Sequence, residues 1–294
     1  MNEVMQSIRE MSTTSAKNYE GDALLWTQRE RNFEPPQEVL VTGLESCGLA
    51  ANDTEAVLNG LAAGQSLEEL ARQISTGQIL TKRTAHGRRH FLKAIKRRYL
   101  NAPSPLPEVK ELAELLPALT SQIAKNQVLL PYFLFSDRAA FEIVGSTILP
   151  CRQLGETRLL KDHILAALYT VFRRHGRKPW GNSLCIRWIE GLLSVLRDVG
   201  ALGRGAERER LLPYAVRPEV FSFHLWGLYD NGLRGRSLHE SSFWRLLLLD
   251  EREAQQLTVA VAARGWWNLT TLGAAEEILP AFHSIDDWVS HELG

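Results

Sequence analysis

The chain has 294 residues with 34 Lys and Arg against 34 Asp and Glu, and 45% of its residues are hydrophobic. This composition is typical of a folded protein with one large or two smaller domains. Its longest apolar stretches, 128–135 and 164–172, fall far short of the roughly 20 residues that span a bilayer. Three widely spaced cysteines and a polar N-terminus without a secretory signal favour a cytoplasmic protein and exclude a disulfide framework.

Two helices are predicted before residue 101. Ser66 and Glu69 match a capping box, apolar residues follow at helical spacing, and Gly77 suits the left-handed cap that ends the helix. A second helix is predicted over 82–100, with its start at Thr81 or Thr84. Prolines 103, 105 and 107 end it and predict a domain boundary.

Further helices are predicted over 108–126, 139–149, 158–175 and 182–199, with the apolar stretch 128–135 as a buried connector. Two short strands are predicted around the polar loop 203–210, so segment 158–217 follows the order of a winged helix. The chain after residue 219 is predicted to be largely helical. It is rich in tryptophan, for which burial in the core is the expected role.

The predicted fold class is therefore mostly α, in three parts. Residues 1–102 form a helical domain with a helix-turn-helix-like pair that ends in the basic helix 82–100. Residues 103–218 form a helical domain with the winged-helix-like segment. Residues 219–294 form a tryptophan-rich helical region.

Charge is segregated along the chain although its sum is zero. Residues 1–69 carry −8, 70–107 carry +9 with no Asp or Glu, 108–151 carry −2, 152–217 carry +7 and 218–294 carry −6. A dense basic stripe is self-repulsive unless a polyanion relieves it, which favours nucleic-acid binding. Pairing between acidic and basic parts of the same chain is the competing interpretation.

A helical wheel of 82–100 segregates most of this charge to one face. Ala85, Leu92, Ile95 and Tyr99 form a predicted core stripe, and Arg88 intrudes on that apolar side. A solvated helix usually carries Glu four residues from Lys, and this helix has none. The predicted phosphate-binding residues in this block are Lys82, Arg83, Arg88, Arg89, Lys93, Lys96 and Arg97.

A second basic cluster ends the predicted helix 158–175 and fills the following turn. It consists of Arg173, Arg174, Arg177 and Lys178, which we expect to extend the phosphate-binding track. Cations are also favoured at helix C-termini by the helix dipole, so a purely structural role is an equal alternative.

Catalytic patterns are missing from the sequence. It contains no phosphate-binding loop, no dinucleotide fingerprint and no nucleophile elbow. His86 and His90 have a metal-compatible spacing, but the surrounding cations oppose a divalent ion. Glu108 and Lys110 resemble half of a nuclease motif without its partner acid. The sequence therefore predicts a protein that is not an enzyme and has no metal and no cofactor.

Several segments together resemble the BrxA family, the small helical accessory proteins of BREX bacteriophage-defence systems. The resemblance lies in 61–70, 77–84, 88–89, 95–99 and 196–202, and it covers about residues 55–220. It implies a cytosolic helical protein that binds double-stranded DNA with weak sequence preference. It also implies partners in phage defence, namely a methyltransferase, an ATPase and a phosphatase-like component.

The predicted function is thus a non-enzymatic double-stranded DNA-binding accessory protein of a BREX-like system, with no membrane partner. Two alternatives remain open at this point. One is an RNA-binding, antitermination-like helical protein, and the other is a protein–protein adaptor without nucleic-acid affinity.

Overall fold

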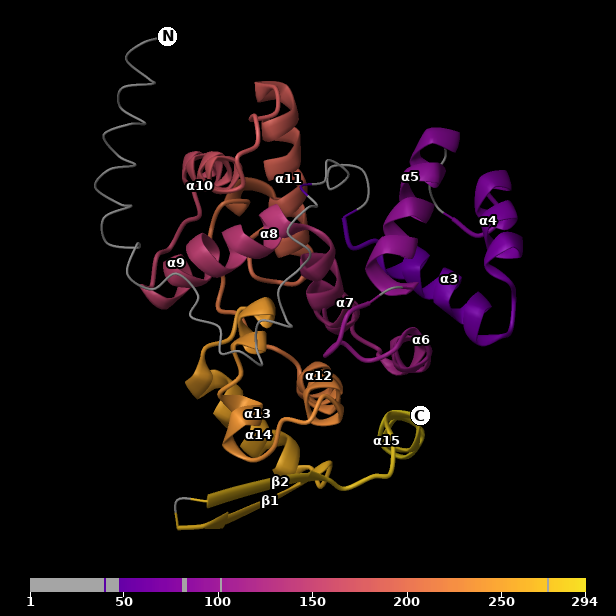
Figure 1. Ribbon diagram of the computed structural model, residues 1–294, viewed down its shortest axis with the longest axis vertical. Coiled ribbons are helices and arrows are strands. Elements are labelled where there is room, and N and C mark those ends of the chain that lie inside the picture. Colours follow the sequence, from indigo (N-terminus) through magenta and orange to yellow (C-terminus); the bar gives the residue numbers. More distant parts are fainter. Residues whose placement is uncertain (1–39, 41–47, 81–83, 101, 274) are drawn as a thin grey trace.

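The protein is built from packed helices with a two-stranded hairpin near its C-terminal end (Figure 1). The computed structural model describes residues 40, 48–80, 84–100, 102–273 and 275–294. The mostly α fold class predicted from the sequence is confirmed. The helix-turn-helix and winged-helix arrangements remain predictions.

The α-helices are α3 (Ala51–Ala62), α4 (Leu67–Thr76), α5 (Ala85–Ile95), α6 (Val109–Ala118), α7 (Gln122–Ser136), α8 (Arg138–Ile143), α9 (Leu149–Gln153), α10 (Lys161–Arg174), α11 (Asn182–Asp198), α12 (Pro218–Asp230), α13 (Arg236–His239), α14 (Glu251–Ala263) and α15 (Ile285–Glu292). π-Helical turns follow α5 and α8, at Lys96–Leu100 and Val144–Ile148, and short 3-10 turns lie at Gly205–Glu207 and Ser242–Leu247. Strands β1 (Trp267–Leu272) and β2 (Ala275–Pro280) pair antiparallel, with Leu269 opposite Ile278.

The ends of the two N-terminal predicted helices follow from local capping. The Ser66 hydroxyl accepts from the Glu69 amide at 3.1 Å, while the Glu69 carboxylate turns to Arg72 instead of returning to Ser66. Gly77 ends α4 with φ of 79°, a conformation that favours glycine. Thr84 caps α5 by accepting from the Gly87 amide at 3.1 Å. The predicted cap residues therefore place α4 and α5 correctly along the chain.

Helix α7 lies at the centre of the fold and is buried on all sides. All of its residues from Asn126 to Ser136 are buried, and α3, α8, α11 and α12 pack around it. The prediction of a helix over 108–126 with a connector at 128–135 is wrong, because a break at 119–121 separates α6 from α7. A helix that is apolar all round has no periodic pattern, so its sequence does not distinguish it from a buried connector.

The middle of the chain follows its predicted boundaries closely. The predicted helix 139–149 is split into α8, a π-helical turn and α9. Helix α10 begins three residues later than predicted, because Arg158 forms a β-bridge with Arg210. The predicted strands around 203–210 reduce to a single antiparallel bridge between Leu202 and Leu211 within the fully described segment 199–217.

The C-terminal region holds the largest departure from the sequence prediction. The hairpin β1–β2 was not predicted, and Glu276 and Glu277 lie in β2. The tryptophans are buried as expected, with exposures of 4% or less at Trp226, Trp244, Trp266, Trp267 and Trp288. Strand β1 was missed because its sequence, WNLTTL, alternates only weakly.

One hydrophobic core runs through all three predicted parts of the chain. The proline-rich segment 103–107 is packed and not extended, since the Tyr132 hydroxyl donates to the Pro107 carbonyl at 2.7 Å. Gly227 of α12 lies so close to this segment that a Cβ there would be 2.1 Å from the Pro105 carbonyl oxygen. The backbone of the predicted boundary is thus in direct contact with the C-terminal region.

Replacing Gly227 with alanine is expected to destabilise the protein by about 1–3 kcal/mol, because the new methyl group collides with backbone that cannot turn away. Urea unfolding followed by circular dichroism measures this change. Gly181→Ala is the matched control, since a Cβ at Gly181 meets open space. Equal midpoints for the two variants would contradict the close packing of α12 on 103–107.

Candidate nucleic-acid interface

Helix α5 presents a continuous basic stripe to solvent. His86, Arg89, Lys93 and Lys96 are all exposed and recur at a spacing that keeps them on one side of the helix and its π-helical extension. No ion pair involves Arg89, Lys93 or Lys96 among the described residues. These three cations are therefore available to an external anion.

The opposite side of α5 packs into the core, although not with all of the residues predicted for it. Phe91, Ala94, Ile95 and Tyr99 are buried, whereas Ala85 is exposed. The rings of His86 and His90 lie 4.3 Å apart on the outer side. The charge segregation inferred from the helical wheel is thus present in the fold, with the core stripe rotated toward Phe91.

Arg88 serves to join α4 to α5. Its Nε donates to the Ser75 carbonyl at 3.0 Å, and its guanidinium lies against Gly77. Glycine at the end of α4 leaves room for this contact, since a Cβ at Gly77 would be 3.3 Å from the guanidinium. Arg88 therefore fixes the angle between the two helices and is less available to phosphate than its neighbours.

The cations at the C-terminal end of the stripe turn inward. Arg98 is 3% exposed, donates to the Gly48 carbonyl and lies 4.8 Å above the Phe133 ring. Arg97 is half-buried and contributes, with Arg98, a positive potential at the buried carboxylate of Asp137. The burial of Arg98 was missed by the sequence reasoning, although its spacing from Phe91 and Ile95 places it on the core side.

The first two residues of the predicted stripe, Lys82 and Arg83, lie outside the described residues. The basic surface that the structure defines therefore begins at His86 and ends at Lys96. It contains three of the seven cations that were predicted for this block, Arg89, Lys93 and Lys96, in exposed positions.

The second basic cluster is partly tied to the protein itself. Glu142 of α8 is 2% exposed and is contacted at 2.6 Å by each of Arg138, Arg174 and His175. Burial alone would raise the pKa of Glu142, but hydrogen bonds from Arg138 and His175 outweigh it and lower this pKa. Arg174 thus anchors the end of α10 to α8.

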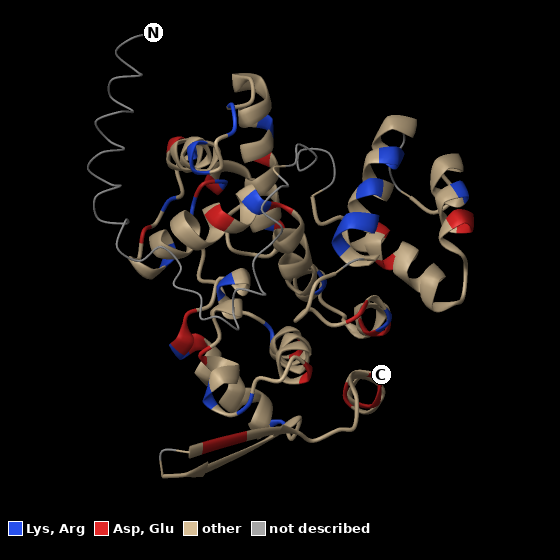
Figure 2. Ribbon diagram, viewed as in Figure 1, with Lys and Arg blue, Asp and Glu red and all other residues tan. Residues whose placement is uncertain are grey.

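The remaining cations of this cluster stay exposed. Arg173 donates to the hydroxyl of Thr170 at 3.2 Å, and Arg177 and Lys178 lie in the exposed turn before α11. Figure 2 shows this turn and the stripe on α5 as separate groups of blue residues, with α11 between them in the view. The structure therefore does not bring the two basic clusters together into one patch.

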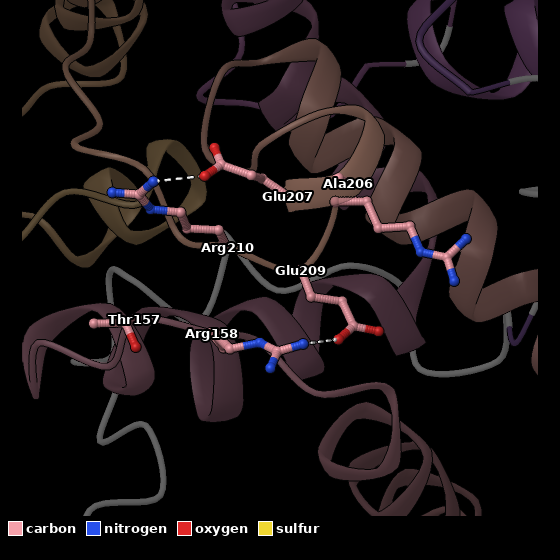
Figure 3. Close-up of a pocket in the computed structure, with 7 residues that line it drawn as sticks. Thr157, Arg158, Ala206, Glu207, Glu209 and Arg210 are labelled. Carbon is pink, nitrogen blue, oxygen red and sulfur yellow. Dashed lines mark hydrogen bonds and ion pairs between the residues drawn. The ribbon is translucent and has the colours of Figure 1, made fainter.

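A surface depression beside α10 carries mixed charge. It is lined by Thr157, Arg158 and 206–210, and Figure 3 shows that each glutamate there faces an arginine. Arg158 contacts Glu209 at 2.9 Å, and Arg210 contacts Glu207 at 2.8 Å. These carboxylates neutralise two of the arginines that line the depression, so it is a poorer phosphate site than α5.

The described residues contain no group of three or more His, Cys, Asp or Glu side chains arranged to hold a metal ion. None of the helices in the described ranges combines the length and the apolar character that crossing a membrane requires.

No family model and no curated protein matches the chain. A crystal structure of an uncharacterized protein from Magnetospirillum magneticum is similar, with a TM-score of 0.52 and 14% sequence identity. The similarity covers 70% of this chain and 96% of that chain. At this identity the likeness shows a shared fold and leaves the function to be argued from the site.

Asp137 makes the stability of the fold depend on pH. Burial raises its pKa from 3.8 to about 6, although the Ala140 amide and the charges of Arg97 and Arg98 favour the ionised form. The folded state therefore binds a proton more tightly than the unfolded state. Stability is expected to fall as pH rises from about 4 to 6, by up to about 3 kcal/mol.

Asp137→Asn tests this dependence, because asparagine caps α8 as well as aspartate does. The variant is expected to match the natural protein near pH 3, below the unfolded pKa, and to exceed its unfolding free energy at pH 8. Urea titrations at the two values measure the difference. If Asp137→Asn were destabilised by the same amount at both pH values, Asp137 would be ionised and stabilising at both of them.

Glu142→Gln is expected to cost about 3–5 kcal/mol at pH 7, because it leaves Arg138 and His175 facing a neutral amide in a buried site. Since the pKa of Glu142 is lowered, its contribution is present above the unfolded pKa and is lost as the solution is acidified through the folded value. Urea unfolding measures both effects. Glu156→Gln, at an exposed position, should change stability by less than about 0.5 kcal/mol.

Proposed function

We propose that the protein binds double-stranded DNA through the exposed stripe on α5 and acts as a non-enzymatic accessory protein. The observation that carries the proposal is the arrangement of Arg89, Lys93 and Lys96. They share one exposed face without an intramolecular ion pair in the described part of the chain, on a segment without Asp or Glu from 70 to 107. Such a surface is stabilised by a polyanion.

The length of the stripe suits a nucleic-acid backbone. Arg89 and Lys96 are seven residues apart, which is about 10.5 Å along a helix axis. One strand of B-DNA carries about three phosphates over that distance. Three cations on the stripe can thus each neutralise one phosphate, and His86 adds a donor at the N-terminal end of α5.

The stripe favours contacts to phosphate over contacts to bases. Segment 84–100 contains no Asn or Gln, the side chains that pair with adenine. Arg88, whose guanidinium could read guanine, instead holds α4 and α5 together. Weak sequence preference follows, and Arg177 and Lys178 offer a second, separate contact to a long duplex.

The resemblance of 61–70, 77–84, 88–89, 95–99 and 196–202 to the BrxA family supports the same proposal. It implies a cytoplasmic protein that acts beside a methyltransferase, an ATPase and a phosphatase-like component of a BREX-like phage-defence system. DNA held on α5 would then be presented to those partners, which supply the chemistry.

The double variant Lys93→Glu and Lys96→Glu is expected to weaken binding to a 30-base-pair duplex by roughly tenfold or more and to lower the salt slope by about 2. Fluorescence anisotropy at three salt concentrations measures both quantities. Arg245→Glu with Arg252→Glu is the matched control, because these cations are also exposed but lie far along the chain on the 3-10 turn and α14.

The binding data separate the proposed DNA-binding function from the RNA-binding and adaptor alternatives. Loss of binding in the α5 variant alone supports the proposal, and equal loss in both variants shows only a dependence on total charge. A structured RNA that outcompetes the duplex would favour the RNA-binding alternative. No binding of the natural protein at low salt would favour the adaptor without nucleic-acid affinity.

A further inference from the structure

The hairpin β1–β2 forms a two-stranded sheet with two outer edges, of which the rest of the protein covers only the one on β2. It lies at one end of the molecule, where β2 runs between β1 and α13 in the view of Figure 1. Two strands alone are marginally stable, and an open edge presents unpaired backbone groups that invite another strand.

The outer edge of β2 is covered. Gly235 approaches it so closely that a Cβ there would lie 2.5 Å from the Glu276 carbonyl oxygen, and the φ of Gly235 is 53°. The Glu276 carboxylate lies between Arg236, at 3.8 Å, and His239, at 3.6 Å. Pro280 at the end of the strand has no amide hydrogen to offer. No further strand fits on this side.

The outer edge of β1 is open over the described residues. The two-residue turn pairs Leu272 with Ala275, and the Ala281 amide donates to the Trp266 carbonyl. Because hydrogen-bonded and non-hydrogen-bonded pairs alternate along the ladder, the N–H and C=O groups of Asn268, Thr270 and Leu272 point toward β2. Those of Leu269 and Thr271 point away from β2, toward the outer edge. No backbone hydrogen bond in the described part of the chain uses these outward groups.

The side chains of β1 provide none of the usual protection against strand pairing. The strand WNLTTL has no charged residue and no proline, and Leu272 is 82% exposed at its tip. Natural edge strands generally carry lysine, proline or a bulge that prevents association. An uncharged edge of this kind favours a strand as its partner.

We propose that β1 pairs antiparallel with β1 of a second copy of this chain and so forms a continuous four-stranded sheet. In this register Leu269 of one copy forms a hydrogen-bonded pair with Thr271 of the other copy, and Thr271 with Leu269. The two Thr270 residues then lie opposite each other, so the two-fold axis passes between them. This inference concerns a different surface from α5 and does not depend on DNA binding.

A second copy fits this edge for two physical reasons. Two uncharged β1 strands meet without like-charge repulsion, while the carboxylates of Glu276 and Glu277 lie on the far strand of each copy, about 14 Å apart across the sheet. Since the β2 edge is covered, pairing through β1 stops at two chains and closes as a symmetric dimer, not a fibre.

Thr271→Pro is the direct test, because it removes the outward amide of β1 and leaves the ladder to β2 intact. Light scattering on a sizing column should show a mass that roughly doubles for the natural protein between about 10 and 200 µM, since a short strand pair is a small interface. Thr271→Val, which keeps the amide, should dimerise normally, and Thr271→Pro should stay monomeric with an unchanged melting temperature.

A disulfide test captures the dimer even when it is weak. Cysteine at Thr270 would place two Cα atoms about 4.5–5.5 Å apart across the axis, within disulfide range. Thr270→Cys should therefore form a covalent dimer on mild oxidation. Asn268→Cys, with its two copies about 13 Å apart, and the natural protein should not.

The proposal is overturned if the natural protein stays monomeric at high concentration and Thr270→Cys does not cross-link. It is also overturned if Thr271→Pro dimerises as well as Thr271→Val does, because the interface would then lie elsewhere on the chain.

Discussion

The burial of α7 from Asn126 to Ser136 is the constraint on which the other elements depend. A helix that is apolar on all sides requires partners on all sides, and α3, α8, α11 and α12 supply them. Its polar side chains are satisfied by the ends of neighbouring segments. Asn126 donates to the Asp198 carbonyl at 2.9 Å, and Gln127 donates to Ala215 and accepts from the Arg217 amide. These bonds fix where α11 ends and α12 begins.

The basic helix is held on this centre by its C-terminal end. Tyr99 lies 5.6 Å from the ring of Tyr132, and Arg98 covers Phe133, both residues of α7. Arg88 then ties α5 to α4 at its other end. Within the described ranges no other element packs on the face between these two anchors, and Arg89, Lys93 and Lys96 are exposed there.

Cations in this chain thus fall into two groups that composition alone does not separate. Arg98, Arg138 and Arg174 have become part of the folded structure because a carbonyl, a ring or a buried carboxylate lies within reach. Others, such as Lys93 and Lys96, have no ion pair with any residue that the structure describes, so an external anion does not have to displace one. The proposed DNA site consists of the second group.

The sequence by itself determined the helical fold class, the caps at Ser66 and Gly77 and the segregation of charge on α5, because each depends on residues within a few positions of one another. It left the start of α5 between Thr81 and Thr84, and the structure decided for Thr84. Only the tertiary structure decided that 128–135 is a helix, that β1 and β2 form a hairpin, that Arg98 is buried and that Arg174 pairs with Glu142. Burial on all sides removes periodicity, and a contact such as Arg174 with Glu142, 32 residues apart, leaves no local signal.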